Sequence, residues 1–289
     1  MPLLRIESVS HALEFRYELG LTNSNFRFRG QADYSWTLMP SIYRYSNFNR
    51  FQTVVFEHNL LNSKPNHPIP PITNTNYDIE WIMLCQHYGV PTRLLDWSQD
   101  IHIALYFACC EKKFKHKDAA LYICNNDDYN AYGSYEQDLM DVQELCFLDT
   151  CIKNPRMRTQ SGSFMLWGHS PLQTDVTESY DLWDFYKQGK TESYIKKITI
   201  PRQFKTKILK ELSNDYGIDY NSLYLKSTTF DKRIEFSKLK DRIQLQTLFT
   251  TDSSRLSIVD KRKARSYFNA NVEDAYKGCI RLSSIKGRI

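Results

Sequence analysis

The chain has 289 residues, of which 42% are hydrophobic and 25% are charged, an ordinary composition for a folded globular protein. Its formal net charge of +5 is mild, so it permits a nucleic-acid or phosphate-bearing partner without indicating one. No run of about 18 apolar residues occurs, and the N-terminal stretch has no signal-peptide character, which excludes a predicted membrane span. The 7 cysteines form no CxxC pair and their number is odd, so we expect reduced thiols and a cytoplasmic protein.

The first quarter of the chain predicts two helices and a strand. Apolar residues recur at helical spacing over 8–19, and Gly20 follows as a stop. A short alternating run predicts a strand over 25–30, and a second helix is predicted over 50–62. Four prolines without periodicity make 63–76 a predicted loop.

The next block has the clearest pattern. The first helix there is expected to end at Gly89, since Pro91 prevents its continuation. Ser98 or Asp100 can cap the second helix, which is apolar on two faces and is therefore expected to be buried against a sheet. The predicted elements are a helix over 78–89, an extended segment over 90–97, a helix over 101–114 and a strand over 119–125.

Beyond residue 125 the patterns are less regular. The last seventy or so residues are polar, with a basic run at 260–267, and predict no element. Helices and strands are mixed without regular βαβ alternation, which predicts an α+β fold. The remaining predictions are a helix within 135–149 followed by a strand at 145–148, a turn with two strands over 154–167, a strand over 192–201 and a helix over 202–217.

Several blocks, in order, resemble the FRG domain family, which is named for the tripeptide Phe28-Arg29-Gly30. The blocks are "FRGQ" with Trp36, Leu38, Pro40 and Arg44 after it, "QHYGVPTRLLDWSQDIHIALYFAC", "NPRMRTQSGSFMLW" and "GIDYNSLYL". Because they span roughly residues 7–226, we predict an FRG domain over 1–226 and a C-terminal extension of unknown role over 227–289.

The same blocks are similar to ADP-ribosyltransferases of the arginine–serine–glutamate type. Those enzymes have a strand ending in aromatic-Arg-Gly, a Ser/Thr strand followed by a helix, and a later Glu-containing segment. Here "FRG", "LDWSQDIHIALYFA" and "QSGSF" follow that order. The resemblance implies an ADP-ribosyltransferase-like mixed β-sheet core flanked by helices, NAD as a substrate, no metal, and a macromolecular acceptor that is a protein or a nucleic acid. Its implied setting is a bacterial toxin or an anti-phage effector.

The resemblance also implies which residues form the site. A guanidinium at Arg29 would grip the NAD diphosphate, although a pair with Asp96 or Asp33 explains an arginine there equally well. Gly30 would let a ligand approach the backbone, and Arg27 is predicted on the same strand face as Arg29. The implied catalytic residues are Arg29, His87, Asp96 and Gln160, and the implied cofactor-binding residues are Arg29, Gly30, Gln31, Tyr88, Arg93 and Ser98.

Each of these positions also has a structural interpretation. His87 can be a last-turn histidine favoured by the helix dipole, Tyr88 a core residue and Ser98 an N-cap. In an extended chain Arg93 and Asp96 point to opposite sides, so each needs another partner. Gln160 stands where those transferases have a glutamate, and an amide supplies no negative charge. The acids that could replace it are Glu144, Asp149 and Asp96.

Two other functions remain open from the sequence. One is a metal-independent nuclease or other nucleic-acid-processing enzyme using His87, Arg29, Arg93 and Asp96. Mild basicity and many aromatic residues are compatible with it. The other is a non-catalytic nucleotide-binding module, which Gln160 favours. The 7 histidines show no metal-ligand spacing, and no P-loop or GxGxxG turn is present.

Overall fold

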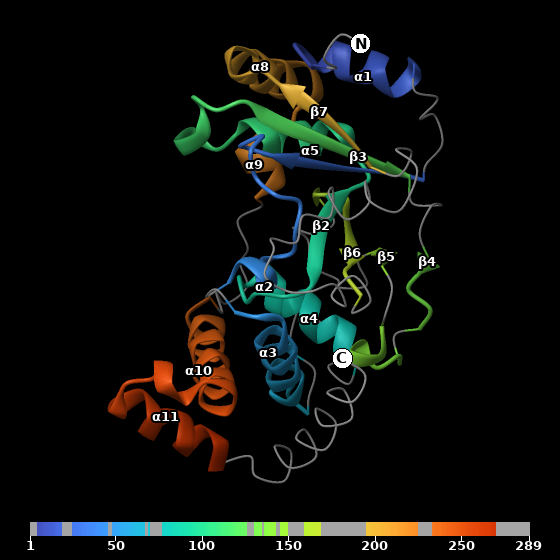
Figure 1. The fold of residues 1–289 in the computed structure, drawn as a ribbon. Helices are drawn as coiled ribbons and strands as arrows, with labels where there is room; N and C mark the ends of the chain where they lie inside the picture. The colour runs from blue at the N-terminus through green and yellow to red at the C-terminus, as the bar shows by residue number, and fades with distance from the viewer. Residues whose placement is uncertain are drawn as a thin grey trace.

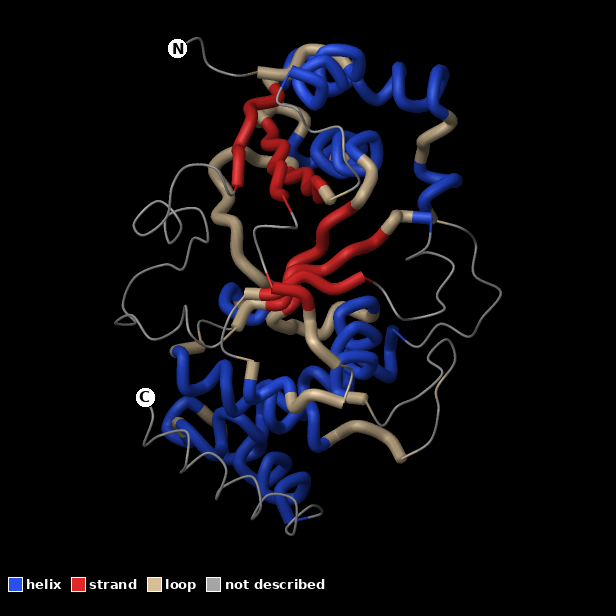
Figure 2. Tube along the Cα trace, turned by 90° about the vertical axis from the view of Figure 1, so that its right-hand side faces the viewer, coloured by secondary structure: helices blue, strands red, loops and turns tan. Residues whose placement is uncertain are grey.

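A computed structural model describes most of the chain, and its described part has an α+β fold, as the sequence predicts. The strands occupy the middle of the molecule, with helices above and below them (Figures 1 and 2). No described helix is both long and apolar enough to cross a bilayer. The described residues are 5–18, 25–45, 48–66, 69, 77–125, 130–134, 136–142, 145–149, 159–168, 195–224 and 233–269.

The helices and strands are distributed along the whole described chain. The α-helices are α1 (Val9–Glu18), α2 (Ser41–Arg44), α3 (Arg50–Asn62), α4 (Asp78–His87), α5 (Ile101–Cys109), α8 (Lys205–Tyr216), α9 (Tyr220–Leu223), α10 (Arg233–Thr251) and α11 (Ile258–Asn269). Short 3-10 turns are η1 (Lys112–Phe114), η3 (Leu139–Asp141), η5 (Arg202–Phe204) and η6 (Ser253–Arg255). The strands are β1 (Phe26–Gln31), β2 (Leu94–Ser98), β3 (Ala119–Asn125), β4 (Asn130–Ala131), β5 (Cys146–Asp149), β6 (Gly162–Leu166) and β7 (Ile195–Ile200).

The described strands form one sheet that is divided near its centre. Their order is β4-β5-β6-β2-β1-β3-β7, and every pairing is antiparallel except the parallel pair β4–β5. At the centre, β1 and β2 meet at a single register pair, Phe28 with Ser98, whereas β1 pairs with β3 along its whole length. The half with β1, β3 and β7 therefore runs in a different direction from the half with β2 and β6 (Figure 1).

Helix α5 covers the half of the sheet that contains β1. Seven of its residues are buried, which confirms the prediction that this helix is buried against a sheet. Helices α1 and α8 complete this layer, and Phe28 on β1 lies in the same hydrophobic cluster. Asp100 is the N-cap of α5, with its side chain accepting from the backbone N–H of His102 at 2.8 Å.

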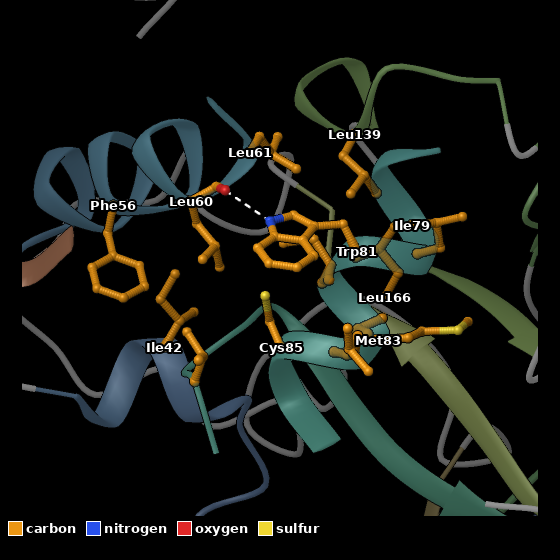
Figure 3. Close-up of a cluster of buried hydrophobic side chains, with 14 of the residues drawn as sticks. Ile42, Phe56, Leu60, Leu61, Ile79, Trp81, Met83, Cys85, Leu139 and Leu166 are labelled. Carbon is orange, nitrogen blue, oxygen red and sulfur yellow. Dashed lines mark hydrogen bonds between the residues drawn. The ribbon is translucent and has the colours of Figure 1, made fainter. Parts of the chain in front are cut away.

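A second core lies between α3, α4 and α10 and the half of the sheet that contains β2 (Figure 3). Trp81 of α4 is at its centre, and its indole N–H donates to the carbonyl of Leu60 at 2.8 Å. Phe236 of α10 packs on Trp81, with ring centroids 5.7 Å apart. The described part of the predicted C-terminal extension thus shares this core, while the predicted boundary at residue 226 lies outside the described residues.

Most predicted elements are confirmed, and the exceptions have local causes. The helix predicted within 135–149 is wrong for its described part, because Asp138 caps a single 3-10 turn and Val142 is extended. The helix predicted to reach residue 114 ends at Cys109, where the chain leaves the apolar core for a lysine-rich exposed run. Helices α10 and α11 were not predicted. The early part of 154–167 and much of 63–76 lie outside the described residues.

Candidate functional site

A cavity of about 370 Å³ opens where the two halves of the sheet diverge. Its walls come from β1, β2, β6, the last turn of α4 and the C-terminal half of α5. The volume lies within the range of small-molecule sites, which is about 300–1,000 Å³. A sheet with continuous pairing from β2 to β1 would leave no such space, so the division of the sheet creates the cavity.

Arg29 lies in this cavity at the end of β1. Its guanidinium donates to the backbone carbonyl of Asp96 at 2.6 Å and lies 3.9 Å from the Asp96 carboxylate. The pairing with Asp96 anticipated from the sequence is therefore present, whereas the Asp33 carboxylate accepts from Ser35 instead. Burial lowers the pKa of Arg29, and Asp96 opposes that shift. The group is still a cation at neutral pH, because an arginine guanidinium keeps its charge in proteins.

Arg27 and Arg29 point to the same face of β1, as predicted, but they have different surroundings. Arg27 is buried and donates to the Ser163 hydroxyl at 3.1 Å and to the Asp149 carboxylate at 3.3 Å. Its charge is thus satisfied within the protein. Arg29 is the member of the pair that lines the cavity.

Gly30 is required by helix α5. A Cβ at this position would lie 1.9 Å from the carbonyl oxygen of Ala104 and 2.6 Å from the backbone nitrogen of Ala108. From the sequence, Gly30 was predicted to let a ligand approach the backbone. In the structure the group that lies close to Gly30 is the backbone of α5, so the packing of α5 is sufficient to explain the glycine.

A hydrogen-bonded chain links the end of α4 to Asp96. The Gln86 amide donates to the Asp96 carboxylate at 2.6 Å, and the Thr92 hydroxyl donates to the Gln86 amide oxygen. His87 lines the same cavity one residue further along. The side chain of Asp96 is still 64% exposed, so it is both oriented and accessible to a ligand.

Ser98 and Gln160 meet at the opposite wall. The Ser98 hydroxyl donates to the Gln160 backbone carbonyl at 3.0 Å and accepts from the Asp100 N–H at 3.1 Å. The Gln160 side-chain amide donates to the carbonyl of Leu223 at 3.4 Å. The next residue, Ser161, has φ 44°, a left-handed conformation that costs a non-glycine residue about 1–3 kcal/mol. A strained turn therefore holds Gln160 against the cavity.

Two of the implied ligand-binding residues lie away from the cavity. Arg93 is 2% exposed, lies 2.6 Å from the Glu57 carboxylate and donates to the carbonyls of Trp167 and Leu139 at 2.8 and 2.7 Å. The prediction that Arg93 and Asp96 do not pair with each other is confirmed. Tyr88 stacks on Phe236 with ring centroids 4.6 Å apart. It therefore packs against the hydrophobic core, which is the structural interpretation considered from the sequence.

Three buried polar atoms of cavity-lining residues have no protein partner in the described part of the chain. They are Nε of Arg29, Oε1 of Gln31 and Nε1 of Trp97. The Gln31 amide nitrogen is partly satisfied, by the carbonyl of Thr37 at 3.4 Å. Buried polar groups are nearly always hydrogen-bonded. Two donors and one acceptor beside the cavity thus have no protein partner in the described part of the chain, and each has almost no accessible surface.

The carboxylates among the described cavity-lining residues are those of Asp96 and Glu111. Of the replacement acids considered from the sequence, Asp149 does not line the cavity and instead accepts from Arg27 and Gln99, and Glu144 lies outside the described residues. Glu111 was missed because nothing in its lysine-rich surroundings marks it. The described residues contain no group of three or more His, Cys, Asp or Glu side chains that could hold a metal ion.

The structure thus defines an α+β protein with a polar, aromatic-lined cavity in a divided sheet. The family model of the FRG domain matches residues 24–117, a segment that contains β1, α3, α4, β2 and α5 and so supplies most of the cavity wall. This match covers about a third of the chain and supports the predicted resemblance to the FRG domain family over those residues. No curated protein and no solved structure matches the chain.

Proposed function

We propose that the protein is an NAD-dependent ADP-ribosyltransferase-like enzyme that modifies a macromolecule. The observation that carries the proposal is that Arg29, Ser98 and Gln160 lie around one cavity, although they are far apart in sequence. These are the residues that the resemblance matches to the arginine, serine and glutamate of such transferases. The setting of a bacterial toxin or an anti-phage effector, which the same resemblance implies, stays a prediction.

In this proposal the reaction transfers ADP-ribose. The bond between the ribose C1′ and the nicotinamide nitrogen breaks, and its electron pair leaves with neutral nicotinamide. A bond from C1′ to an oxygen or nitrogen of the acceptor forms, and the acceptor loses a proton. Arg29 suits the diphosphate because a guanidinium forks onto phosphate oxygens, and Trp36 and Phe107 supply aromatic surface for the rings.

The weakest part of this site is its acid. Gln160 can hydrogen-bond a ribose hydroxyl, but it cannot stabilise the positive charge that develops on the ribose. The carboxylates available for that task among the described cavity-lining residues are Asp96 and Glu111. If neither serves, the protein is a nucleotide-binding module without transferase activity, which is one outcome of the experiment below.

One of the four residues considered for a nuclease does not line the cavity. Arg93 is held in the core by Glu57, and the cavity retains Arg29, His87 and Asp96. Since a phosphodiester in the cavity would be out of reach of Arg93, we make ADP-ribosyl transfer the proposed function.

The test is incubation of the protein with adenylate-labelled NAD⁺, with and without cell lysate. Wild type should release nicotinamide and transfer label to a macromolecule, and Arg29→Ala should do neither. Arg255→Ala, which removes an exposed arginine of η6, is the matched control and should behave as wild type. Equal label transfer by Arg29→Ala, or none by folded wild type with any lysate fraction, would refute the proposal.

A further inference from the structure

A run of lysines lies at the rim of the cavity. It follows α5 directly, and Glu111, the residue before it, lines the cavity. All four lysines are exposed, and none of them forms an ion pair with a carboxylate in the described part of the chain. We call this segment the basic rim; its lysines are Lys112, Lys113, Lys115 and Lys117.

The basic rim is fixed in place against the turn after β1. Lys205 is 3% exposed, and its ammonium group donates to the carbonyl of Ala32 at 2.7 Å and to that of Phe114 at 2.9 Å. The rings of Trp36 and Phe114 meet edge to face with centroids 4.7 Å apart. Because Ala32 and Trp36 also line the cavity, the rim and the cavity wall form one rigid unit.

Aromatic side chains are interspersed with these charges. Tyr34 is 37% exposed, and its backbone N–H donates to the carbonyl of Asp118, at the end of the basic rim. The Lys197 ammonium lies 4.1 Å from the centroid of the Tyr34 ring and adds a further cation on this side. The acid that ends the run, Asp118, accepts from the backbone N–H of Arg202 at 2.9 Å.

We infer that the basic rim binds a single-stranded nucleic acid and presents one of its nucleotides to the cavity, so that the macromolecular acceptor is nucleic acid. Four neighbouring cations match phosphates spaced along a nucleic-acid strand, and the exposed ring of Tyr34 suits base stacking. The nucleic acid must be single-stranded, because a base within a duplex cannot enter a cavity unless it leaves the base stack. This inference rests on the proposed function for the use of the bound strand, but the binding itself can be measured without NAD.

The test is fluorescence anisotropy with a labelled 20-mer of single-stranded RNA or DNA and no NAD. Four phosphate contacts predict a slope of about −2.8 for log affinity against log salt, which is an approximately 50-fold loss between 50 and 200 mM. The variant Lys113→Glu/Lys115→Glu should bind at least about tenfold more weakly and have a shallower slope. Duplex of the same sequence should bind more weakly than either single strand.

The matched control reverses a second basic cluster. Arg262 and Lys263 are exposed on α11, which lies at the opposite end of the molecule from α5 (Figure 1). The variant Arg262→Glu/Lys263→Glu changes the net charge equally and should bind like wild type. Equal losses in both variants would show a nonspecific charge effect and overturn the inference. So would tighter binding to polyglutamate or to vesicles containing phosphatidylserine than to the 20-mer.

These results are separable from those for the proposed function. Binding of the 20-mer without any NAD turnover would refute the proposed function and leave the rim as a nucleic-acid site. NAD turnover with label found on protein alone, and no binding of the 20-mer, would overturn the inference and leave the proposed function standing.

Discussion

Replacing Gly30 with alanine should strongly destabilise the fold. The added Cβ would lie 1.9 Å from the carbonyl oxygen of Ala104, whereas ordinary contact begins at 3.4 Å. Helix α5 would have to move by roughly 1.5 Å, and its close-packed surroundings resist such a shift. Overpacking typically costs about 1–3 kcal/mol, and a clash with backbone belongs at the upper end or beyond it. About 3 kcal/mol corresponds to a fall in Tm of about 6–12 °C for a chain of this size.

The assay is thermal unfolding followed by circular dichroism, with Gly133→Ala as the matched control. A Cβ at Gly133 would meet only the Gln137 side chain, at 3.8 Å, so that variant should melt within about 2 °C of wild type. If Gly30→Ala also melts within 2 °C of wild type, then α5 does not lie where the structure places it, and the explanation of this glycine is refuted.

Three further predictions address the buried ion pair, helix α10 and the missing acid. Arg93→Met should lower the free energy of unfolding, measured by urea denaturation, by about 3–5 kcal/mol, because the Glu57 carboxylate is left buried without a cation. Adding Glu57→Leu to that variant should recover part of the loss. An unchanged urea midpoint for Arg93→Met would contradict the buried ion pair. Phe236→Ala should lower stability by about 3–5 kcal/mol if α10 shares the core, whereas an independent extension would leave the main transition unchanged. Gln160→Glu should raise the rate of nicotinamide release above that of wild type, while Gln137→Glu should not; equal rates in all three proteins would refute the role given to position 160.

The parts of the fold that were predicted correctly are those fixed by local pattern. Helix α4 ends near Gly89, which has φ 83°, and α8 ends at Gly217, with φ 65°; both left-handed glycines are visible in the sequence as helix stops. The end of α5 at Cys109 could not be predicted in this way, because no glycine follows the helix, and the prediction extended it to residue 114. The run after Cys109 keeps helical periodicity, but its lysines have no core to pack against.

The parts of the site that were missed depend on contacts between distant residues. Nothing near Gly30 in the sequence shows that α5, about seventy residues later, lies against it. Arg93 belongs to a motif that resembles a binding site, but Glu57 on α3 holds it in the core. Glu111 joins the cavity only because α5 ends beside β1. Tertiary packing, rather than residue type, decides which polar side chains of a motif reach the cavity.

The central claim is that Arg29 holds a phosphate-bearing ligand in the divided sheet, and calorimetric titration of NAD⁺ tests it most directly. Wild type should bind one NAD⁺ per chain, and Arg29→Ala should bind about 10- to 150-fold more weakly, because it loses about 1.5–3 kcal/mol of charged hydrogen bonding. Arg29→Lys should fall between the two, since an ammonium group keeps the charge but not the fork. No binding of NAD⁺ by folded wild type, or the same affinity in Arg29→Ala, would contradict the claim.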